Sequence, residues 1–149
     1  MTYGQFWRIN AVTIAILIFI ISLTPDPEKM VQAQSFTTWL ARMIFGNPTA
    51  ADKIAHFMAY GGLAFFSILG FVNRPAHYIR IMSILMAYGF LLEIFQAMGG
   101  IRQGDGADML ANGAGVIMGA GGAFCVRYFT RYFGINIPFP IRPKTRSSS

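Results

Sequence analysis

The chain has 149 residues, of which 54% are hydrophobic and 12% charged. An average soluble domain carries roughly 25% charged residues, so this composition excludes an ordinary soluble protein and indicates an integral membrane protein. The net charge of +6 does not predict nucleic-acid binding, because five of the twelve basic residues lie in the last 23 positions, at and after the end of the last apolar run, where positive charge beside a membrane helix is expected. A lone cysteine, Cys125, excludes an internal disulfide and a cysteine metal site.

Four apolar stretches are long enough to cross a bilayer as helices, which takes about 20 residues each. The first follows an aromatic and basic anchor at residues 3–8 and stops before Pro25. A cleaved signal peptide is the competing interpretation, but the cleavage-like pattern at Ala33 lies beyond two prolines. We expect transmembrane helices at about residues 3–23, 54–72, 81–98 and 109–129.

Residues 35–45 predict a short amphipathic helix. Apolar side chains recur there at three- and four-residue spacing opposite polar ones, namely at Phe36, Trp39, Leu40, Met43 and Ile44. This segment is too short to span a membrane, so we expect it to lie on the bilayer surface. It could serve as a cover over the bundle or as an entrance for a lipid substrate.

The basic residues predict an orientation. Four spans place both termini on one side, together with Arg8, Arg74, Arg80 and the five basic residues from Arg127 onward, against four basic residues on the other side. Positive charge collects on the cytoplasmic side, so both termini are expected there and all six carboxylates outside. The prediction is one all-α membrane domain, residues 1–130, followed by a basic cytoplasmic tail, residues 131–149, that is partly disordered.

The second span begins with a polar face. Thr49 and Asp52 form the [ST]-x-x-[DE] pattern of a helix start. Asp52, His56 and Tyr60 follow one another at four-residue spacing, which stacks them on one helix face, with Lys53 alongside. The first turns of the second span therefore carry polar side chains on one face.

Charged and polar residues also mark the third and fourth spans. Glu93 and Gln96 lie near the outer end of the third, with Glu93 roughly 7 Å inside the helix end. A carboxylate at this depth indicates a functional site, because burying it in lipid costs about 2.5 to 3.5 kcal/mol. The fourth span carries one stripe at spacings of three and four: Arg102, Asp105, Asp108, Asn112, Gly115 and Gly119. Its two glycines predict close contact with another helix.

The outer ends of three spans therefore converge on one polar pocket. Each acid at a helix start could instead complement the helix dipole or cap free amides, and His56 or Tyr60 could have a structural role. Glu93 belongs to no helix start and needs a partner, which favours a site. The predicted site contains Asp52, Lys53, His56, Tyr60, Glu93, Gln96, Arg102, Asp105, Asp108 and Asn112.

The residue types allow two ligand classes. Arg102 and Lys53 beside helix N-termini suit a phosphate or carboxylate. Oxygen ligands suit a hard cation, and His56 extends the choice to a transition metal. The metal candidates are Asp105, Asp108, Asn112 and Glu93. No cofactor follows from the spacing, which matches no recognised metal motif.

Three linked motifs resemble the VanZ-like family of small bacterial membrane proteins, named for an accessory protein of teicoplanin resistance. They are Asp52-Lys53-x-x-His56-x-x-x-Tyr60, Glu93-x-x-Gln96, and the stripe from Arg102 to Gly119. The resemblance covers the four spans. It implies a multi-pass protein of the bacterial cytoplasmic membrane whose polar signature comprises His56, Glu93, Gln96, Arg102, Asp108 and Asn112. It implies neither a particular reaction nor antibiotic resistance.

These residues are compatible with three functions. The first is binding or remodelling of an anionic envelope lipid or lipid-linked cell-wall precursor at the outer membrane face. The second is a hydrolase or transferase acting on a phosphate-bearing lipid, with His56, Glu93 or Asp108 as catalytic candidates. The third is a structural subunit of a membrane complex or homo-oligomer, in which the polar residues only hold helices together.

Overall fold

The computed structural model describes residues 3–24, 36–72, 76–99 and 106–135. All regular structure in these segments is helical, and four helices are long and apolar enough to cross a membrane, which confirms the predicted class and the number of spans. The elements are α1 (Tyr3–Ser22), α3 (Phe36–Phe45), the 3-10 turn η1 (Pro48–Ala50), α4 (Ala51–Phe71), α5 (Ala76–Met98) and α6 (Gly106–Tyr132).

Helices extend beyond the apolar runs that predicted them. α5 begins at Ala76 rather than near residue 81, and α6 runs from Gly106 to Tyr132 rather than from about 109 to 129. Hydrophobicity marks only the part of a helix that suits hydrocarbon, whereas the backbone hydrogen bonds continue into the polar flanks. Most of the predicted tail, residues 136–149, lies outside the described residues.

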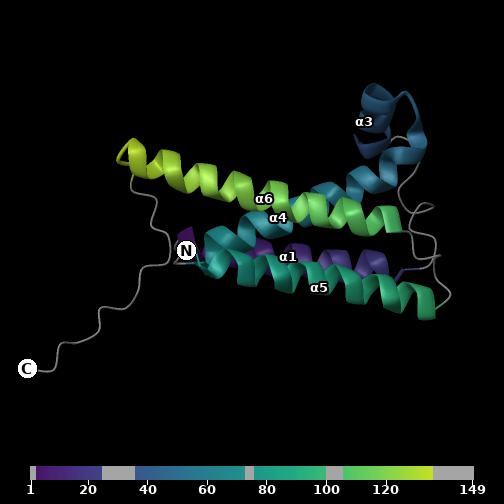
Figure 1. The fold of residues 1–149 in the computed structure, drawn as a ribbon, viewed down its shortest axis with the longest axis horizontal. Helices are drawn as coiled ribbons and strands as arrows, with labels where there is room; N and C mark the ends of the chain where they lie inside the picture. The colour runs from purple at the N-terminus through teal and green to yellow at the C-terminus, as the bar shows by residue number, and fades with distance from the viewer. Residues whose placement is uncertain (1–2, 25–35, 73–75, 100–105, 136–149) are drawn as a thin grey trace, which may run out of the picture.

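α4 and α6 run side by side in the same direction (Figure 1). Lys53 near the start of α4 contacts Asp108 near the start of α6, and Arg127 near the end of α6 contacts Ile68 near the end of α4. α1 and α5 run the opposite way, since Arg8 at the start of α1 contacts Gly70 at the end of α4. We call the two ends of the bundle the His56 end and the Arg127 end.

Glycines let α4 and α6 approach to backbone contact. A Cβ atom added to Gly119 would collide with the carbonyl oxygen of Gly61, and one added to Gly115 would collide with the carbonyl oxygen of Phe57. Glycine is therefore required at both positions, as the stripe in the sequence indicated. This contact sets which residues of the two helices face each other.

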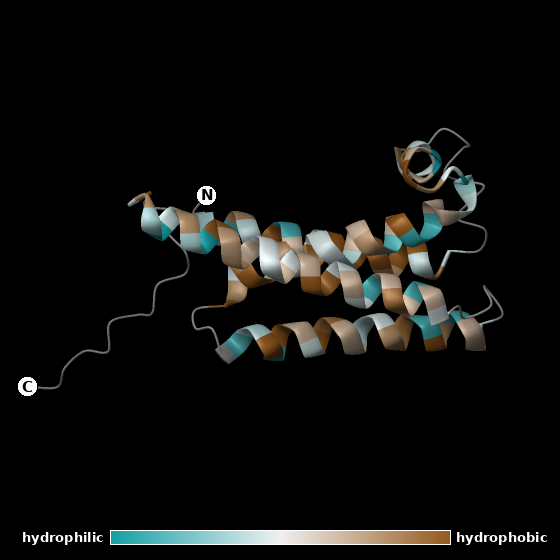
Figure 2. Ribbon diagram, turned by 45° about the horizontal axis from the view of Figure 1, so that its top comes forward, coloured by the Kyte–Doolittle hydropathy of each residue, from teal (hydrophilic) through white to brown (hydrophobic). Residues whose placement is uncertain are grey.

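Apolar side chains fill the centre of the bundle and also cover its outside. Leu63, Leu92 and Val116 belong to a buried cluster shared by α4, α5 and α6. Many other large apolar residues, such as Ile16 and Phe95, are exposed, and hydrophobic positions recur along the outward surfaces of the helices in Figure 2. An exposed apolar surface of this extent suits lipid rather than water.

The short helix α3 lies beside the His56 end of the bundle (Figure 1). Phe36, Trp39 and Met43 are exposed, and the rings of Phe36 and Trp39 stack on each other. Ala41, in contrast, is fully buried. The helix is amphipathic and spans nearly the predicted residues, with one side anchored and the aromatic side open.

Two arginines bind the last turn of α4. Arg127 is only 9% exposed and donates to the carbonyl oxygens of Ile68 at 2.7 Å and of Val72. Arg8 donates from Nε to the Gly70 carbonyl at 2.9 Å. The Ile68 carbonyl also accepts the backbone N–H of Val72, whereas the last carbonyls of the helix have no continuing turn to supply donors. Arg127 therefore belongs to the last span, and its side chain reaches inward and caps a neighbouring helix.

Enlarging Gly119 should separate α4 from α6. We expect Gly119→Ala to lower the free energy of unfolding by about 1–3 kcal/mol, because the new methyl group meets backbone rather than a flexible side chain. Gly121→Ala is the matched control, since a Cβ there contacts nothing within 4 Å. Thermal unfolding in detergent measures both, and equal melting temperatures would contradict the proposed packing role.

Removing the Arg127 guanidinium should destabilise the Arg127 end. We expect Arg127→Leu to cost about 1.5–3 kcal/mol, because the α4 carbonyls lose charge-assisted hydrogen bonds. Arg131→Leu, one turn later on the exposed side of α6, should change stability by about 0.5 kcal/mol or less. A denaturant titration of the two variants checks the difference, which would vanish if Arg127 acted only as a surface charge.

Candidate functional site

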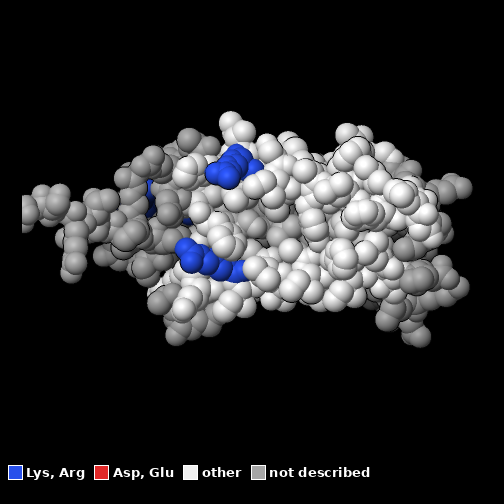
Figure 3. Space-filling view, turned by 90° about the horizontal axis from the view of Figure 1, so that it is seen from below, with Lys and Arg blue, Asp and Glu red and all other residues white. Residues whose placement is uncertain are grey.

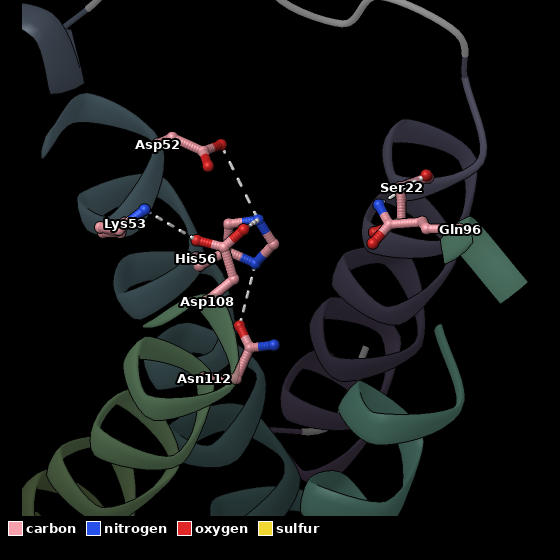
Figure 4. Close-up of polar contacts among 7 residues, drawn as sticks. All are labelled: Ser22, Asp52, Lys53, His56, Gln96, Asp108 and Asn112. Carbon is pink, nitrogen blue, oxygen red and sulfur yellow. Dashed lines mark hydrogen bonds and ion pairs between the residues drawn. The ribbon is translucent and has the colours of Figure 1, made fainter. Parts of the chain in front are cut away.

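Five polar side chains meet at the His56 end, where α4 and α6 begin (Figure 4). We call Asp52, Lys53, His56, Asp108 and Asn112 the His56 cluster. Asp52 and His56 are one turn apart on α4, and Asp108 and Asn112 are one turn apart on α6. The glycine contact of the two helices brings these faces together, so residues more than 50 positions apart in the sequence become neighbours.

Asp108 is the most buried member of the cluster, at 3% exposure. Its Oδ1 atom lies 3.4 Å from Lys53 Nζ, and its Oδ2 atom lies 4.0 Å from His56 Nε2. The Lys53 side chain is 40% exposed. A buried carboxylate without a cation nearby would carry a large desolvation cost, so Lys53 stabilises Asp108 while remaining accessible from outside.

His56 is held in one orientation by Asn112. Its Nδ1 atom lies 3.0 Å from Asn112 Oδ1. An amide oxygen only accepts hydrogen bonds, so Nδ1 carries the proton and the Nε2 atom of the neutral ring has a free lone pair. Nε2 faces Asp52 Oδ1 at 3.8 Å and Asp108 Oδ2 at 4.0 Å.

The start of α4 differs from the predicted capping pattern. Asn47 Oδ1 accepts a hydrogen bond from the Thr49 amide at 2.9 Å and caps the turn η1, in which Pro48 occupies the first position. α4 itself begins after Ala50 without a side-chain cap. Thr49 is therefore not the cap of α4, because Asn47 and Pro48 start the turn earlier. Asp52 faces His56 across one helical turn.

The polar residues of α5 have other surroundings. Gln96 Nε2 donates to the Ser22 carbonyl at 2.7 Å and so ties α5 to the end of α1 (Figure 4). Tyr60 is buried with its ring against Gly89. Glu93 is 8% exposed and lies on α5 one turn after Gly89, against which the Tyr60 ring packs. Sequence spacing gave no sign of the Gln96 contact, because its acceptor is a backbone atom.

The structure brings together three residues that could hold a metal ion, of which only Asp108 is among the four predicted metal candidates. Potential ligand atoms of Asp52, His56 and Asp108 all lie within 4.8 Å of one another. Asn112 accepts a hydrogen bond from His56 Nδ1, and the described group does not include Glu93. Two predicted site residues, Arg102 and Asp105, lie outside the described residues. The four-residue spacing of Asp52 and His56 was the signal for the observed set.

The Asn112 contact predicts the tautomer of His56. Nitrogen NMR of histidine-labelled protein should show a neutral His56 ring protonated at Nδ1, because Asn112 Oδ1 accepts from that atom. Asn112→Leu should abolish the preference. His77, on the exposed start of α5, is the internal reference. A His56 ring protonated mainly at Nε2 in the unaltered protein would contradict this geometry.

Comparison with known proteins agrees with the motifs. Residues 3–127 match the family VanZ/LLP1. No curated protein matches the chain, and no solved structure does. The match extends from the first residue of α1 to Arg127 and includes all five members of the His56 cluster. The resemblance drawn from the motifs is confirmed: the chain belongs to the VanZ/LLP1 family and is a multi-pass membrane protein.

Proposed function

We propose that the protein binds the phosphate-bearing headgroup of an anionic envelope lipid, or of a lipid-linked cell-wall precursor, at the outer face of the bacterial cytoplasmic membrane. One observation carries the proposal. The N-termini of two parallel helices, α4 and α6, lie side by side at the His56 end with the half-exposed Lys53 between them. Helix N-termini present positive partial charge and free amides, and Lys53 adds a full positive charge.

The charge distribution supports an orientation with both termini in the cytoplasm. Arg8, Arg80, Arg127 and Arg131 lie toward the Arg127 end, whereas Lys53, two carboxylates and, on α3, Arg42 lie at the His56 end. On the face drawn in Figure 3, Lys and Arg gather toward the Arg127 end, and no described Asp or Glu is visible. The excess of basic residues marks the cytoplasmic side. The His56 end then faces outward.

Helix α3 fits the same proposal as an interfacial element. Its exposed aromatic side, with Phe36 and Trp39 stacked, lies at the level of the His56 end. A short amphipathic helix with aromatic residues on one side lies in the headgroup region of a bilayer. α3 would thereby hold the outer leaflet close to Lys53, which is where a lipid headgroup has to arrive.

Chemistry on the bound lipid is a second candidate, supported by the orientation of His56. A histidine whose Nδ1 atom is fixed by another side chain is arranged like a general base, with Nε2 available for a proton. The third interpretation, a purely structural subunit, draws on the contact of Gln96 with α1. It predicts the same lipids on variants of the cluster as on the unaltered protein.

Lys53 provides the test. Native mass spectrometry of the purified protein should show a retained phosphate-bearing lipid, and Lys53→Gln should reduce its occupancy by about tenfold or more, because a charged hydrogen bond contributes about 1.5–3 kcal/mol. Arg80→Gln, an exposed cation near the opposite end, is the matched control. Equal lipid retention by Lys53→Gln, Arg80→Gln and unaltered protein, all folded, would refute headgroup binding and favour the structural role.

A further inference from the structure

The His56 cluster carries a net charge that does not suit a phosphate. Asp52 and Asp108 contribute two negative charges and Lys53 one positive charge, which leaves the cluster at −1 with a neutral His56. A phosphate approaching Lys53 would also approach these two carboxylates. A divalent cation bound between them would change the local charge to +1 and remove this repulsion.

We infer that Asp52, His56 and Asp108 bind one divalent transition-metal ion at the His56 end. The inference extends the proposed function and rests on it only for the phosphate that the ion would contact. The metal site itself follows from the positions of three ligand atoms: Asp52 Oδ1, His56 Nε2 and Asp108 Oδ2.

These three atoms have nearly the spacing that an ion requires. His56 Nε2 lies 3.8 Å and 4.0 Å from the two carboxylate oxygens, and the group fits within 4.8 Å. A point equidistant from atoms so spaced lies about 2.5 Å from each, or slightly less, compared with about 2.0–2.2 Å for zinc bound to nitrogen or oxygen. Rotamer adjustments of a few tenths of an ångström, on the order of that difference, complete the site.

The protonation of each ligand also fits a metal. Asn112 fixes the His56 proton on Nδ1, so the lone pair of Nε2 points toward the two carboxylates. Around bound metals, a ligating histidine usually donates a hydrogen bond from its other ring nitrogen to a second group. A cation bound at Nε2 would also be attracted by the two carboxylates that face this atom.

Asp108 provides an observation independent of the histidine. The residue is more than nine-tenths buried, and Lys53 donates to Oδ1. The other oxygen, Oδ2, faces His56 Nε2 at a distance beyond hydrogen-bond range. A cation between Oδ2 and Nε2 would be attracted by this buried carboxylate oxygen and coordinated by the ring nitrogen. Lys53 binds the opposite oxygen, so it does not compete with the ion.

The donor set predicts the class of metal. One imidazole nitrogen and two carboxylate oxygens suit zinc, manganese or cobalt, whereas calcium and magnesium prefer oxygen ligands alone. Three protein ligands leave one or more positions on the ion for an outside group. A phosphate oxygen bound there would also be near the exposed Lys53 ammonium.

Calorimetric titration with zinc chloride tests the site in the full-length protein, purified without a polyhistidine tag. The chain has two histidines, which gives a matched pair of variants. We expect about one zinc ion per chain for the unaltered protein and for His77→Phe, and loss of this binding in His56→Phe and Asp108→Asn. Excess calcium should leave zinc binding unchanged, and cobalt should compete. Circular dichroism and melting curves establish that each variant is folded.

A second variant keeps the test decisive if the ligand substitutions unfold the protein. Asn112→Leu retains all three ligands but releases His56 Nδ1, so it should weaken zinc binding by about 10- to 100-fold with unchanged stoichiometry. The inference is overturned if the folded protein binds no zinc saturably, or if folded His56→Phe binds it as His77→Phe does.

A parallel measurement tests lipid binding separately from metal binding. Native mass spectra recorded after treatment with a chelator report lipid retention without metal. Retained phosphate lipid together with absent zinc binding overturns the metal site and leaves the proposed function intact. Saturable zinc binding that depends on His56, with no lipid retained, supports the metal site and removes the proposed function.

Discussion

The backbone contact between α4 and α6 determines the rest of this structure. Gly115 and Gly119 let α6 lie directly against Phe57 and Gly61 of α4, and a wider separation would leave the polar side chains at the helix starts out of reach. Because both helices run in the same direction, their N-termini meet at one end and their C-termini at the other. Glycine packing in the middle thus positions charge at both ends, which links membrane packing to the chemistry of the site.

The helix dipole stabilises charges of opposite sign at the two ends of the bundle. At the His56 end, the carboxylates of Asp52 and Asp108 lie at the positive ends of α4 and α6. At the Arg127 end, guanidinium groups meet the negative end of α4. These carboxylates and guanidinium groups are therefore placed where a helix terminus offsets part of the cost of burying them. Glu93 differs, since it is buried within α5, before the last turn of the helix.

Much of this arrangement could be predicted from the sequence because it depends on periodicity. Hydrophobic runs gave the four spans, and three- and four-residue spacing identified the faces of α4 and α6 that form the His56 cluster. The pairing of these side chains was not predictable, since one sequence does not state which oxygen faces which nitrogen. The contact of Asn112 Oδ1 with His56 Nδ1 is visible only in the structure. Contacts to backbone atoms were also missed. Arg127 and Gln96 both bind carbonyl oxygens, which leave no pattern in the side chains.

The arginine contacts at the last turn of α4 constrain the order in which the membrane domain can be completed. The carbonyl of Gly70 receives a side-chain donor from α1, which is synthesised earlier, whereas those of Ile68 and Val72 receive the Arg127 guanidinium from α6, which is synthesised after α4 and α5. Until α6 has inserted, part of the end of α4 must rely on water or headgroups for its hydrogen bonds. α6 therefore completes the hydrogen bonding at the end of α4. A chain shortened before Arg127 would lack this contact between the two helices.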